Sequence, residues 1–366
     1  MAEPVRVLHV FGKLDKGGAE SRTMDIYRTI DRSRVQFDFI VHHQEQGFFE
    51  AEIKTLGGRV FHKIPRFKVF NIVKYMKAWS LFLEEHEFSC IHIHMTTVAA
   101  PVLCMANKYG IKMRVCHAQS SSEIGFSRKL ITFLSRPWMK KLATYRFAVS
   151  DIAGKFAYGE GYSIVRDAID LESFRYNDII RAKMRKMFGI EKNFVIGHIG
   201  RFHKVKNHQF ILNVFANSLK KIPNALLILV GDGELRNDIE TKIGQMNISD
   251  KVLLLGIRDD VQDLLQTFDL LVLSSLFEGL PGVAIEAQAT GLPCILSETI
   301  TPEAQVIDGL VSYQPIDKGV YPWLEEIRQI AENPPSRRDT YEDMKRAGFD
   351  VKDAVVWFER FYTEAK

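Results

Sequence analysis

Short apolar runs rich in β-branched and aromatic residues alternate along this chain with segments whose apolar residues recur every three or four positions. Such alternation is typical of a parallel β-sheet wrapped by helices. In the first half the pattern predicts strands at Val5–Phe11, Phe37–His42, Arg59–Ile64, Cys90–His94, Met113–His117 and Arg146–Val149, and helices at Ala19–Ile30, Asn71–Glu85 and Val98–Tyr109.

A second series of strands and helices follows a polar, charged stretch at Asp170–Lys192, within which Asn177–Phe188 is predicted to form a short helix. Two such series do not fit comfortably in one sheet, so two doubly wound domains are predicted. The tail after residue 335 is predicted to be helical, with its aromatic residues forming a packing face. The second series comprises strands Phe194–Ile199, Ala225–Val230, Val252–Leu255, Leu270–Leu273 and Pro293–Leu296 and helices His208–Leu219, Leu235–Gln245 and Pro281–Thr290, and the tail aromatics are Trp357, Phe358, Phe361 and Tyr362.

Length and composition agree with two globular domains. The 366 residues are 46% hydrophobic and 26% charged, which excludes a disordered chain and a membrane-embedded fold. The first ten residues lack a signal-peptide pattern, and no stretch reaches the roughly 18 apolar residues of a transmembrane helix. The cysteines are not spaced as C-x-x-C, so neither a zinc site nor a disulfide framework is predicted, and a cytoplasmic location is expected; they are Cys90, Cys104, Cys116 and Cys294.

Charge is distributed unevenly between the two halves. The net charge is +4, but residues 1–180 hold 26 basic and 19 acidic side chains (+7) and the remainder holds 23 and 26 (−3). Two stretches, 54–77 and 124–150, carry several basic residues and no acid, and the second also contains Phe126, Phe133, Trp138 and Leu142. A basic, aromatic helix of this kind can lie on an anionic membrane surface, although an ordinary solvated face explains it too. The basic residues are Lys54, Arg59, Lys63, Arg66, Lys68, Lys74 and Lys77, then Arg128, Lys129, Arg136, Lys140, Lys141 and Arg146.

The most informative segment is the string from Phe277 to Glu286, which follows the strand Leu270–Leu273 and opens a helix, with Pro281 suited to its first turn. The amides of Gly282 and Val283 would be unpaired at the helix start and available to an anionic or polar ligand. Carboxylates at Glu278 and Glu286 can accept hydrogen bonds from sugar hydroxyls.

This string resembles the E-x7-E signature of the family 4 retaining glycosyltransferases, which have the two-domain GT-B fold. The resemblance implies that Glu278 contacts the donor sugar, that Glu286 contacts the ribose of the nucleotide, and that the Gly282 and Val283 amides face the diphosphate and sugar. In the stretches Leu8–Glu20 and Val195–Asn207, the chain looks most like the members of this family that assemble bacterial capsules and exopolysaccharides.

Two further segments match the same family. Gly200, Arg201 and Lys206 follow the strand Phe194–Ile199, where a guanidinium and an ammonium could clamp a diphosphate. The loop from Asp15 to Glu20 contains Gly17 and Gly18 and resembles the family's N-terminal glycine loop, whose backbone can approach phosphate closely. This loop is not G-x-G-x-x-G, which counts against a dinucleotide site.

The remaining matches are weaker. Strand ends at Val230–Leu235 and Leu255–Val261 match segments that border the nucleobase, and Arg258 is named there. The family places a histidine near the donor sugar at the position of His117, although a strand-end histidine satisfied by a carbonyl is the alternative. His92 and His94 should share one face of a strand, and a structural role is favoured over metal binding.

The resemblance implies a fold of two Rossmann-like domains facing a cleft: an acceptor-side domain at 1–172, a donor-binding domain at 173–348, and a helix at 349–366 returning to the first domain. One departure concerns the interdomain strand, where Asp167 and Ala168 stand in place of the family's usual Asn-Gly before Ile169. That departure puts the detailed hinge geometry in doubt.

The predicted activity is retaining transfer of a sugar from a nucleotide sugar, expected to be a UDP-sugar, to a glycan or lipid-diphosphate-linked acceptor in surface polysaccharide synthesis. The chain has no Asp-x-Asp, so no metal or other cofactor is expected, and nucleic acid is not expected as a partner. Peripheral association with the inner face of the cell membrane is a further expectation. The alternatives are a nucleotide-sugar epimerase of the same fold and a non-catalytic sugar-nucleotide-binding protein; a nicotinamide oxidoreductase is disfavoured.

Overall fold

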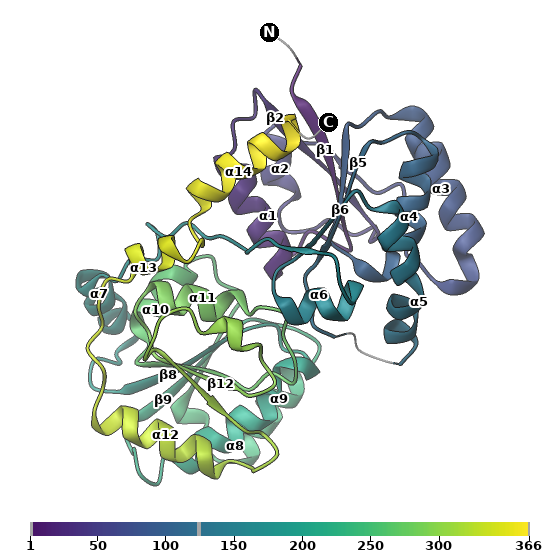
Figure 1. The fold of residues 1–366 in the computed structure, drawn as a ribbon. Helices are drawn as coiled ribbons and strands as arrows, with labels where there is room; N and C mark the ends of the chain where they lie inside the picture. Colours follow the sequence, from purple (N-terminus) through teal and green to yellow (C-terminus); the bar gives the residue numbers. More distant parts are fainter. Residues whose placement is uncertain (1–2, 123–125, 365–366) are drawn as a thin grey trace. The chain divides into compact units, whose positions relative to one another are not determined.

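The computed structural model describes residues 3–122 and 126–364, without the side chains of residues 126–128. The chain divides into two compact units, one formed by residues 1–170 with 348–366 and the other by residues 171–347. Each unit is an α/β layer structure with its own sheet (Figure 1).

The sheet of the first unit has its strands in the order β3-β2-β1-β4-β5-β6-β7, and every pair of neighbours is parallel. Strands β1 and β4 lie at the centre of this sheet, and the last five residues of β1 and all of β4 are buried, as expected of central parallel strands. The strands are β1 (Val5–Phe11), β2 (Val35–Val41), β3 (Val60–Phe61), β4 (Cys90–Ile93), β5 (Met113–Ala118), β6 (Tyr145–Ala148) and β7 (Ser163–Ile164).

Helices cover both faces of this sheet (Figure 1). On one side α3, α4 and α5 pack in sequence, α4 lying against both of the others. On the other side α1 and the C-terminal helix α14 pack against each other. The helices are α1 (Gly18–Thr29), α2 (Glu50–Thr55), the 3₁₀ turn η1 (Val69–Asn71), α3 (Ile72–Glu85), α4 (Thr96–Lys108), α5 (Phe126–Leu142), α6 (Asp151–Tyr158) and α14 (Val351–Glu364).

The C-terminal helix α14 is part of the core of the first unit. Val355, Phe358 and Tyr362 are buried against β1 and β2, whereas Trp357 remains exposed. The returning chain is held by hydrogen bonds between Ile169 and the backbone of Phe349 and Val351. The tail aromatics therefore form the predicted packing face, with Trp357 at its exposed edge, where its ring stacks on Phe361.

The second unit has a six-stranded parallel sheet in the order β10-β9-β8-β11-β12-β13. Its core lies between the sheet and the helices that flank it, and Trp323 is fully buried there. The elements are α7 (Asp178–Phe188), β8 (Phe194–Ile199), η2 (Lys204–Lys206), α8 (His208–Ser218), β9 (Ala225–Val230), α9 (Arg236–Gln245), η3 (Ser249–Lys251), β10 (Val252–Gly256), α10 (Val261–Thr267), β11 (Leu270–Leu273), α11 (Gly282–Ala289), β12 (Cys294–Ser297), η4 (Pro302–Ala304), β13 (Val311–Gln314), α12 (Tyr321–Glu332) and α13 (Tyr341–Arg346).

The prediction of one continuous helical tail after residue 335 is wrong. Residues 336–340 are not helical, and α13 is separated from α14 by a break at Gly348, which has a left-handed φ of +82°. Glycine adopts this conformation without the steric cost that other residues meet, so it ends one helix and redirects the chain. Strands β7 and β13 were not predicted; β7 has only two residues, both exposed, and β13 is half-buried throughout.

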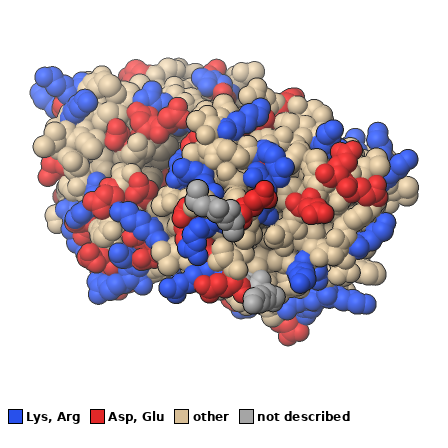
Figure 2. Space-filling view, turned by 90° about the horizontal axis from the view of Figure 1, so that it is seen from above, with Lys and Arg blue, Asp and Glu red and all other residues tan. Residues whose placement is uncertain are grey.

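No helix in the described part of the chain is both long enough and apolar enough to cross a membrane. Figure 2 shows Lys and Arg side chains mixed with Asp and Glu over the face that it displays. Basic and acidic side chains are therefore interspersed on this face and are not separated into patches of one sign.

Candidate functional site

Two neighbouring strands of the second unit, β8 and β11, end beside each other and carry the loops that contain the predicted chemistry. The Leu276 amide donates to the Val205 carbonyl at 2.8 Å, and the Ser274 hydroxyl donates to the Asn207 carbonyl at 3.2 Å. These bonds fasten the loop after β11 to the turn η2 after β8. Ligands of open parallel sheets bind at this carboxyl edge.

The two loops bring Lys206 and Glu278 together. The Lys206 ammonium lies 2.5 Å from Glu278 Oε1, which also accepts a hydrogen bond of 2.7 Å from the Ser275 hydroxyl. Both charged side chains are largely shielded, with exposed fractions of 20% and 16%. Removing one partner of such a pair leaves the other charge poorly solvated, so the pair is a tightly held polar centre.

Glycines at the strand ends allow the loops around this centre to pack closely. A side chain at Gly231, whose φ is +133°, would put Cβ 2.1 Å from the Gly200 carbonyl oxygen, and a Cβ at Gly233 would lie 2.6 Å from that of Phe202. Gly200 is itself covered by the aliphatic part of Lys206, at 3.3 Å from its own Cβ position. Only glycine fits at Gly231 without moving the Gly200–Arg201 backbone.

Arg201 lies in the same loop but is not part of the Lys206–Glu278 pair. It is exposed, and its guanidinium makes no ion pair or hydrogen bond with any described residue. The structure therefore brings Gly200, Lys206 and Glu278 together and leaves Arg201 available at the surface of the loop.

The helix α11 begins at Gly282, with Pro281 as its N-cap residue and no side-chain cap. Pro281 thus precedes the first turn rather than lying within it. A Cβ at Gly282 would meet nothing within 4 Å, so protein packing does not require glycine there. The amides of Gly282 and Val283, the first two helical residues, cannot have partners within the helix. Glu286 is buried one turn further along α11.

Arg258 follows β10 and forms a bidentate ion pair with Asp260, with N···O distances of 2.9 and 2.6 Å. The hydrogen bond to Asp260 raises the pKa of Arg258, which stays fully charged. The ion pair with Asp260 holds the Arg258 guanidinium along the loop. The role of Arg258 beside a nucleobase stays a prediction.

In the first unit, Gly17 and Gly18 follow β1 and open α1. Gly17 is the N-cap residue and has no side chain to satisfy the helix, and Gly18 is exposed with open space around its Cβ position. The N-cap residue of α1 therefore supplies no side-chain cap, and the Glu20 carboxylate lies over Gly17, with Oε2 2.2 Å from the position that a Cβ would take.

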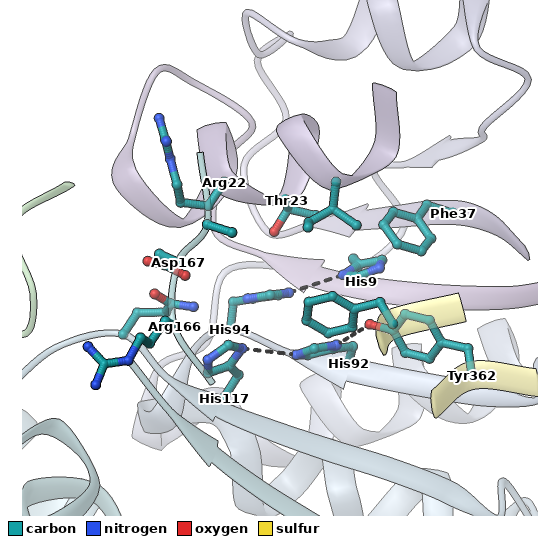
Figure 3. A pocket seen from close by; sticks show the side chains of 14 residues that line it. His9, Arg22, Thr23, Phe37, His92, His94, His117, Arg166, Asp167 and Tyr362 are labelled. Atoms are coloured by element: carbon teal, nitrogen blue, oxygen red, sulfur yellow. Dashed lines mark hydrogen bonds between the residues drawn. The ribbon is translucent and has the colours of Figure 1, made fainter. Parts of the chain in front are cut away.

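A small pocket lies at the carboxyl edge of the first sheet and is lined by four histidines (Figure 3). His9, His92 and His117 come from β1, β4 and β5, which are neighbours in the sheet, and His94 directly follows β4. Burial lowers the pKa of His117 to about 4 and holds the pKa of the other three well below 6.5. All four rings are therefore neutral at pH 7.

The arrangement of the histidines does not suit a metal ion. Ring nitrogens of His9, His92 and His94 lie within 4.8 Å of one another. However, the rings of His92 and His94 are stacked, with centroids 4.5 Å apart and planes 7° from parallel. Metal-binding imidazoles direct lone pairs in the ring plane toward one point, which stacked rings cannot do without rotating. The prediction that His92 and His94 share one face of the strand is confirmed by the stacking.

Asp167 lines the same pocket, together with Arg22 and Gln119. Burial raises the pKa of Asp167 to about 7, although Arg22 and Gln119 lower it. The neighbouring Ala168 is buried in the core of the unit. The departure from the family's usual Asn-Gly at these two positions thus places a carboxyl that titrates near neutrality at the pocket.

Sequence reasoning missed several residues that the structure places at these sites. His9, Tyr362 and Arg22 line the histidine pocket, and Ser275 holds Glu278. His9 carried a usable signal, because it lies on the same face of β1 as Val7 and Phe11 near the strand's carboxyl end. Tyr362 carried none, since its contact depends on where the C-terminal helix packs.

Comparison with known proteins identifies the family of this chain. Residues 180–348 match the family model described as glycosyl transferases group 1. The chain is 35% identical over 362 residues to EpsF of Bacillus subtilis (strain 168), to which glycosyltransferase activity is attributed, covering 96% of this chain and 94% of that protein. Over 141 residues it is 38% identical to the Escherichia coli UDP-Gal:alpha-D-GlcNAc-diphosphoundecaprenol alpha-1,3-galactosyltransferase, covering 37% of this chain and 36% of that enzyme.

Among solved structures, Anabaena Alr3699/HepE in complex with UDP and glucose superposes with a TM-score of 0.80 over 98% of this chain and all of that one, at 18% identity. The fold and its two parallel sheets define the GT-B class of glycosyltransferases, built from two Rossmann-like units. The chain belongs to the group 1 glycosyltransferase family, and the predicted resemblance to the family 4 enzymes with the GT-B fold is confirmed.

Proposed function

We propose that this glycosyltransferase moves a sugar from a UDP-sugar to a glycan or lipid-diphosphate-linked saccharide during synthesis of a surface polysaccharide, with retention of anomeric configuration. The observation that carries the proposal is the Lys206–Glu278 pair at the joined ends of β8 and β11, with the open start of α11 in the same unit. The names of the Escherichia coli relative and of the HepE complex support UDP as the nucleotide.

In this proposal the second unit holds the donor. Lys206 and the exposed Arg201 bind the diphosphate, one as a point charge and the other as a fork that bridges two oxygens. The amides of Gly282 and Val283 add two further donors, and the open space at Gly282 allows phosphate or sugar to approach the backbone. Glu278 accepts hydrogen bonds from sugar hydroxyls, and Glu286 accepts them from the ribose.

Binding of a diphosphate changes the partner of Lys206. The ammonium that now neutralises Glu278 turns toward the phosphate oxygens, and the carboxylate becomes available to hydroxyl donors. Charge that develops on the departing diphosphate is stabilised by Lys206, Arg201 and the start of α11, so no metal ion is needed for departure. The leaving phosphate accepts the proton of the acceptor hydroxyl on the face from which it departs, which yields retention.

The glycine loop at Gly17 and Gly18 and the ring of His117 belong to the first unit. We assign the loop to contact with phosphate and His117 to a hydroxyl of the donor sugar. Gly200 and Arg258 are assigned to the nucleotide, Gly200 by permitting close approach and Arg258 by bordering the base.

Two measurements test the proposed reaction. Screening nucleotide sugars for protection against thermal unfolding should identify UDP-sugars as stabilising ligands. The anomeric configuration of the transferred sugar, read by NMR of the product, should match that of the donor. An inverted product would refute the retaining mechanism, whereas release of an epimerised nucleotide sugar from donor alone would favour the epimerase. Stabilisation by UDP-sugars without any turnover would favour a non-catalytic binding protein.

We also propose that the first unit docks on anionic membrane, where a lipid-linked acceptor resides. The helix α5 turns several large apolar side chains outward: Leu130, Phe133, Leu134 and Trp138 are 43–61% exposed, whereas Thr132, Ser135 and Met139 are buried. A helix packed only on its own protein would turn most of its large apolar residues inward. The exposed stripe follows the spacing of one helical face.

A second apolar segment lies at the start of α3, on the same side of the sheet as α5. Val69, Phe70 and Val73 are 65%, 85% and 80% exposed, and exposed Lys68 and Lys74 flank them. Lys129 and Lys141 are exposed on α5. Inserting large apolar side chains contributes about 1.5–3 kcal/mol each, and each basic residue near anionic lipid about 1 kcal/mol.

Liposome flotation tests membrane docking. The wild-type chain should float with vesicles that contain anionic lipid and not with neutral ones at low salt, and F133S/W138S should abolish flotation. The control I179S/I257S replaces two exposed apolar residues of the second unit with serine and should float normally. Equal flotation of F133S/W138S and wild type would overturn this proposal.

A further inference from the structure

A row of hydrogen bonds joins the C-terminal helix to His117 (Figure 3). The Tyr362 hydroxyl lies 2.7 Å from Nδ1 of His92, and Nε2 of His92 lies 3.3 Å from Nδ1 of His117. All three side chains are buried. A hydroxyl on α14 is therefore connected through one imidazole to the ring that we assign to the donor sugar.

The order of protons along this row follows from its members. Burial lowers the pKa of both histidines and raises the pKa of Tyr362, so all three groups are neutral at pH 7. A neutral imidazole has one N–H donor and one acceptor nitrogen, and a phenol has a single proton to donate. Among the described residues, Nδ1 of His92 is the one hydrogen-bond partner of the Tyr362 hydroxyl.

One order of protons leaves fewer buried polar atoms unpaired than the other. If Tyr362 donates to Nδ1 of His92, then Nε2 of His92 carries the proton and donates to Nδ1 of His117. His117 must then carry its own proton on Nε2, the one buried atom of the row without a partner among the described residues. In the reverse order the Tyr362 proton also lacks an acceptor among the described residues, so two buried polar atoms are unpaired instead of one.

We propose that Tyr362 is a positioning residue that acts through His92 to fix His117 in the tautomer with its proton on Nε2. His117 then offers the substrate an N–H donor and not a lone pair. Its role toward a sugar is to bind a hydroxyl oxygen, and it does not remove a proton. The expected effect on catalysis rests on the proposed role of His117 in donor binding. The expected tautomer of His117 does not depend on that role.

The substitution Y362F isolates the hydroxyl. The ring of Tyr362 packs on Phe358 and Phe37, with centroids 5.6 and 5.8 Å away, and phenylalanine keeps both contacts. Tyr27 supplies a matched control, because it is also fully buried in the first unit and its hydroxyl donates to Gln36 Oε1 at 2.6 Å, away from His117. Y27F removes a comparable hydrogen bond and leaves the row intact.

The direct test is nitrogen-15 NMR of the imidazoles in the full-length chain, with His117 assigned by comparison with H117Q. In the wild type, Nε2 of His117 should be protonated and Nδ1 should not, and Y27F should show the same state. In Y362F both tautomers of His117 should be populated. A proton on Nδ1 of His117 in the wild type, or an unchanged tautomer in Y362F, would overturn the proposal.

Kinetics test the consequence. Y362F should lower kcat/KM for the nucleotide sugar about tenfold, the scale of one hydrogen bond, and Y27F should leave it unchanged. In the H117Q background Y362F should cause no further loss, because an amide carries an N–H donor whatever its neighbour does. An equal loss in both backgrounds would show that Tyr362 acts structurally and would refute the positioning role. Failure of the wild type to transfer sugar would refute the proposed function, and the NMR result would still decide the tautomer.

Discussion

Individual charged residues at the two sites are held in states that a ligand or a proton can change. Lys206 and Glu278 form an ion pair at 2.5 Å. Asp167, in contrast, shares its pocket with neutral histidines and with Arg22, and burial raises its pKa to about 7 although Arg22 lowers it. A bound diphosphate would separate Lys206 from Glu278, whereas the Asp167 carboxyl loses its proton near physiological pH.

The state of Asp167 predicts a pH-dependent stability. Its folded pKa of about 7 lies above the ordinary value of 3.8, so the native state binds the proton more tightly than the unfolded state does. Stability contributed by this proton is present at low pH and is lost as the pH rises from about 4 to 7. Asp167→Asn keeps a neutral side chain at every pH.

We therefore expect D167N to gain stability relative to wild type between pH 4 and pH 7, by about 1 kcal/mol or more, with no further gain above pH 7. Thermal midpoints of both proteins measured in parallel from pH 4 to pH 8.5 check this. Since other titrating groups are shared, their effects cancel in the difference. A difference that does not vary with pH would contradict the raised pKa.

Individual residues also show how much of the site could be predicted from the sequence. Glu278, Lys206 and Gly282 were found from linear motifs, because each lies in the segment between a predicted strand and the helix that follows it or at the start of that helix. The Lys206–Glu278 contact itself was not predicted, since it depends on β8 and β11 being neighbours in the sheet. The row from Tyr362 to His117 required both the strand order and the packing of a helix far along the chain.

Among the secondary-structure elements, the loops after β8 and β9 depend on glycine for their close contact. A Cβ at Gly231 would lie 2.1 Å from the Gly200 carbonyl oxygen, with the backbone at a φ of +133° that other residues rarely adopt. Gly244 is a contrasting case, because it is an exposed residue of α9 with nothing near its Cβ position.

We expect G231A to destabilise the second unit by about 2 kcal/mol or more and to weaken UDP binding, since Gly200 and Arg201 must move. The control G244A should instead stabilise it by about 0.5–1 kcal/mol, the difference between glycine and alanine within a helix. Chemical denaturation and UDP titration measure both effects. Wild-type stability in G231A would show that the loop contact is not as close as described.

Elements with a strong pattern were predicted well, and those defined by tertiary context were not. Strands β8, β9 and β11 were predicted with the bounds that the structure has, because each is a short apolar run between polar turns. Strand β7 has two exposed residues and exists only through pairing with β6. The break at Gly348 was missed because the helical pattern continues on both sides of it.

For the whole molecule, the donor-binding residues named from the sequence are concentrated in one unit. Arg201, Lys206, Glu278 and Glu286 all belong to the unit of residues 171–347, which has a sheet and core of its own. That unit should therefore carry most of the response to the nucleotide.

Hydrogen exchange of the full-length chain with and without UDP should show this response. Protection is expected in the loops at residues 200–207 and 275–283, where the backbone closes on the ligand. The exposed apolar face of α5 should exchange equally in both states. Protection confined to the first unit would contradict the assignment of the donor site to the second.

The central claim is that sugar transfer depends on Glu278 at the ends of β8 and β11. The most direct measurement compares transfer rates from the stabilising UDP-sugar by wild type, E278A and E332A, at equal folded concentration. Glu332 is the control, since it lies at the end of α12, its side chain is 56% exposed and it pairs with Arg328. We predict that E278A loses at least about 100-fold in kcat/KM while keeping its fold, and that E332A transfers as wild type does. Near-normal turnover by E278A would contradict the account.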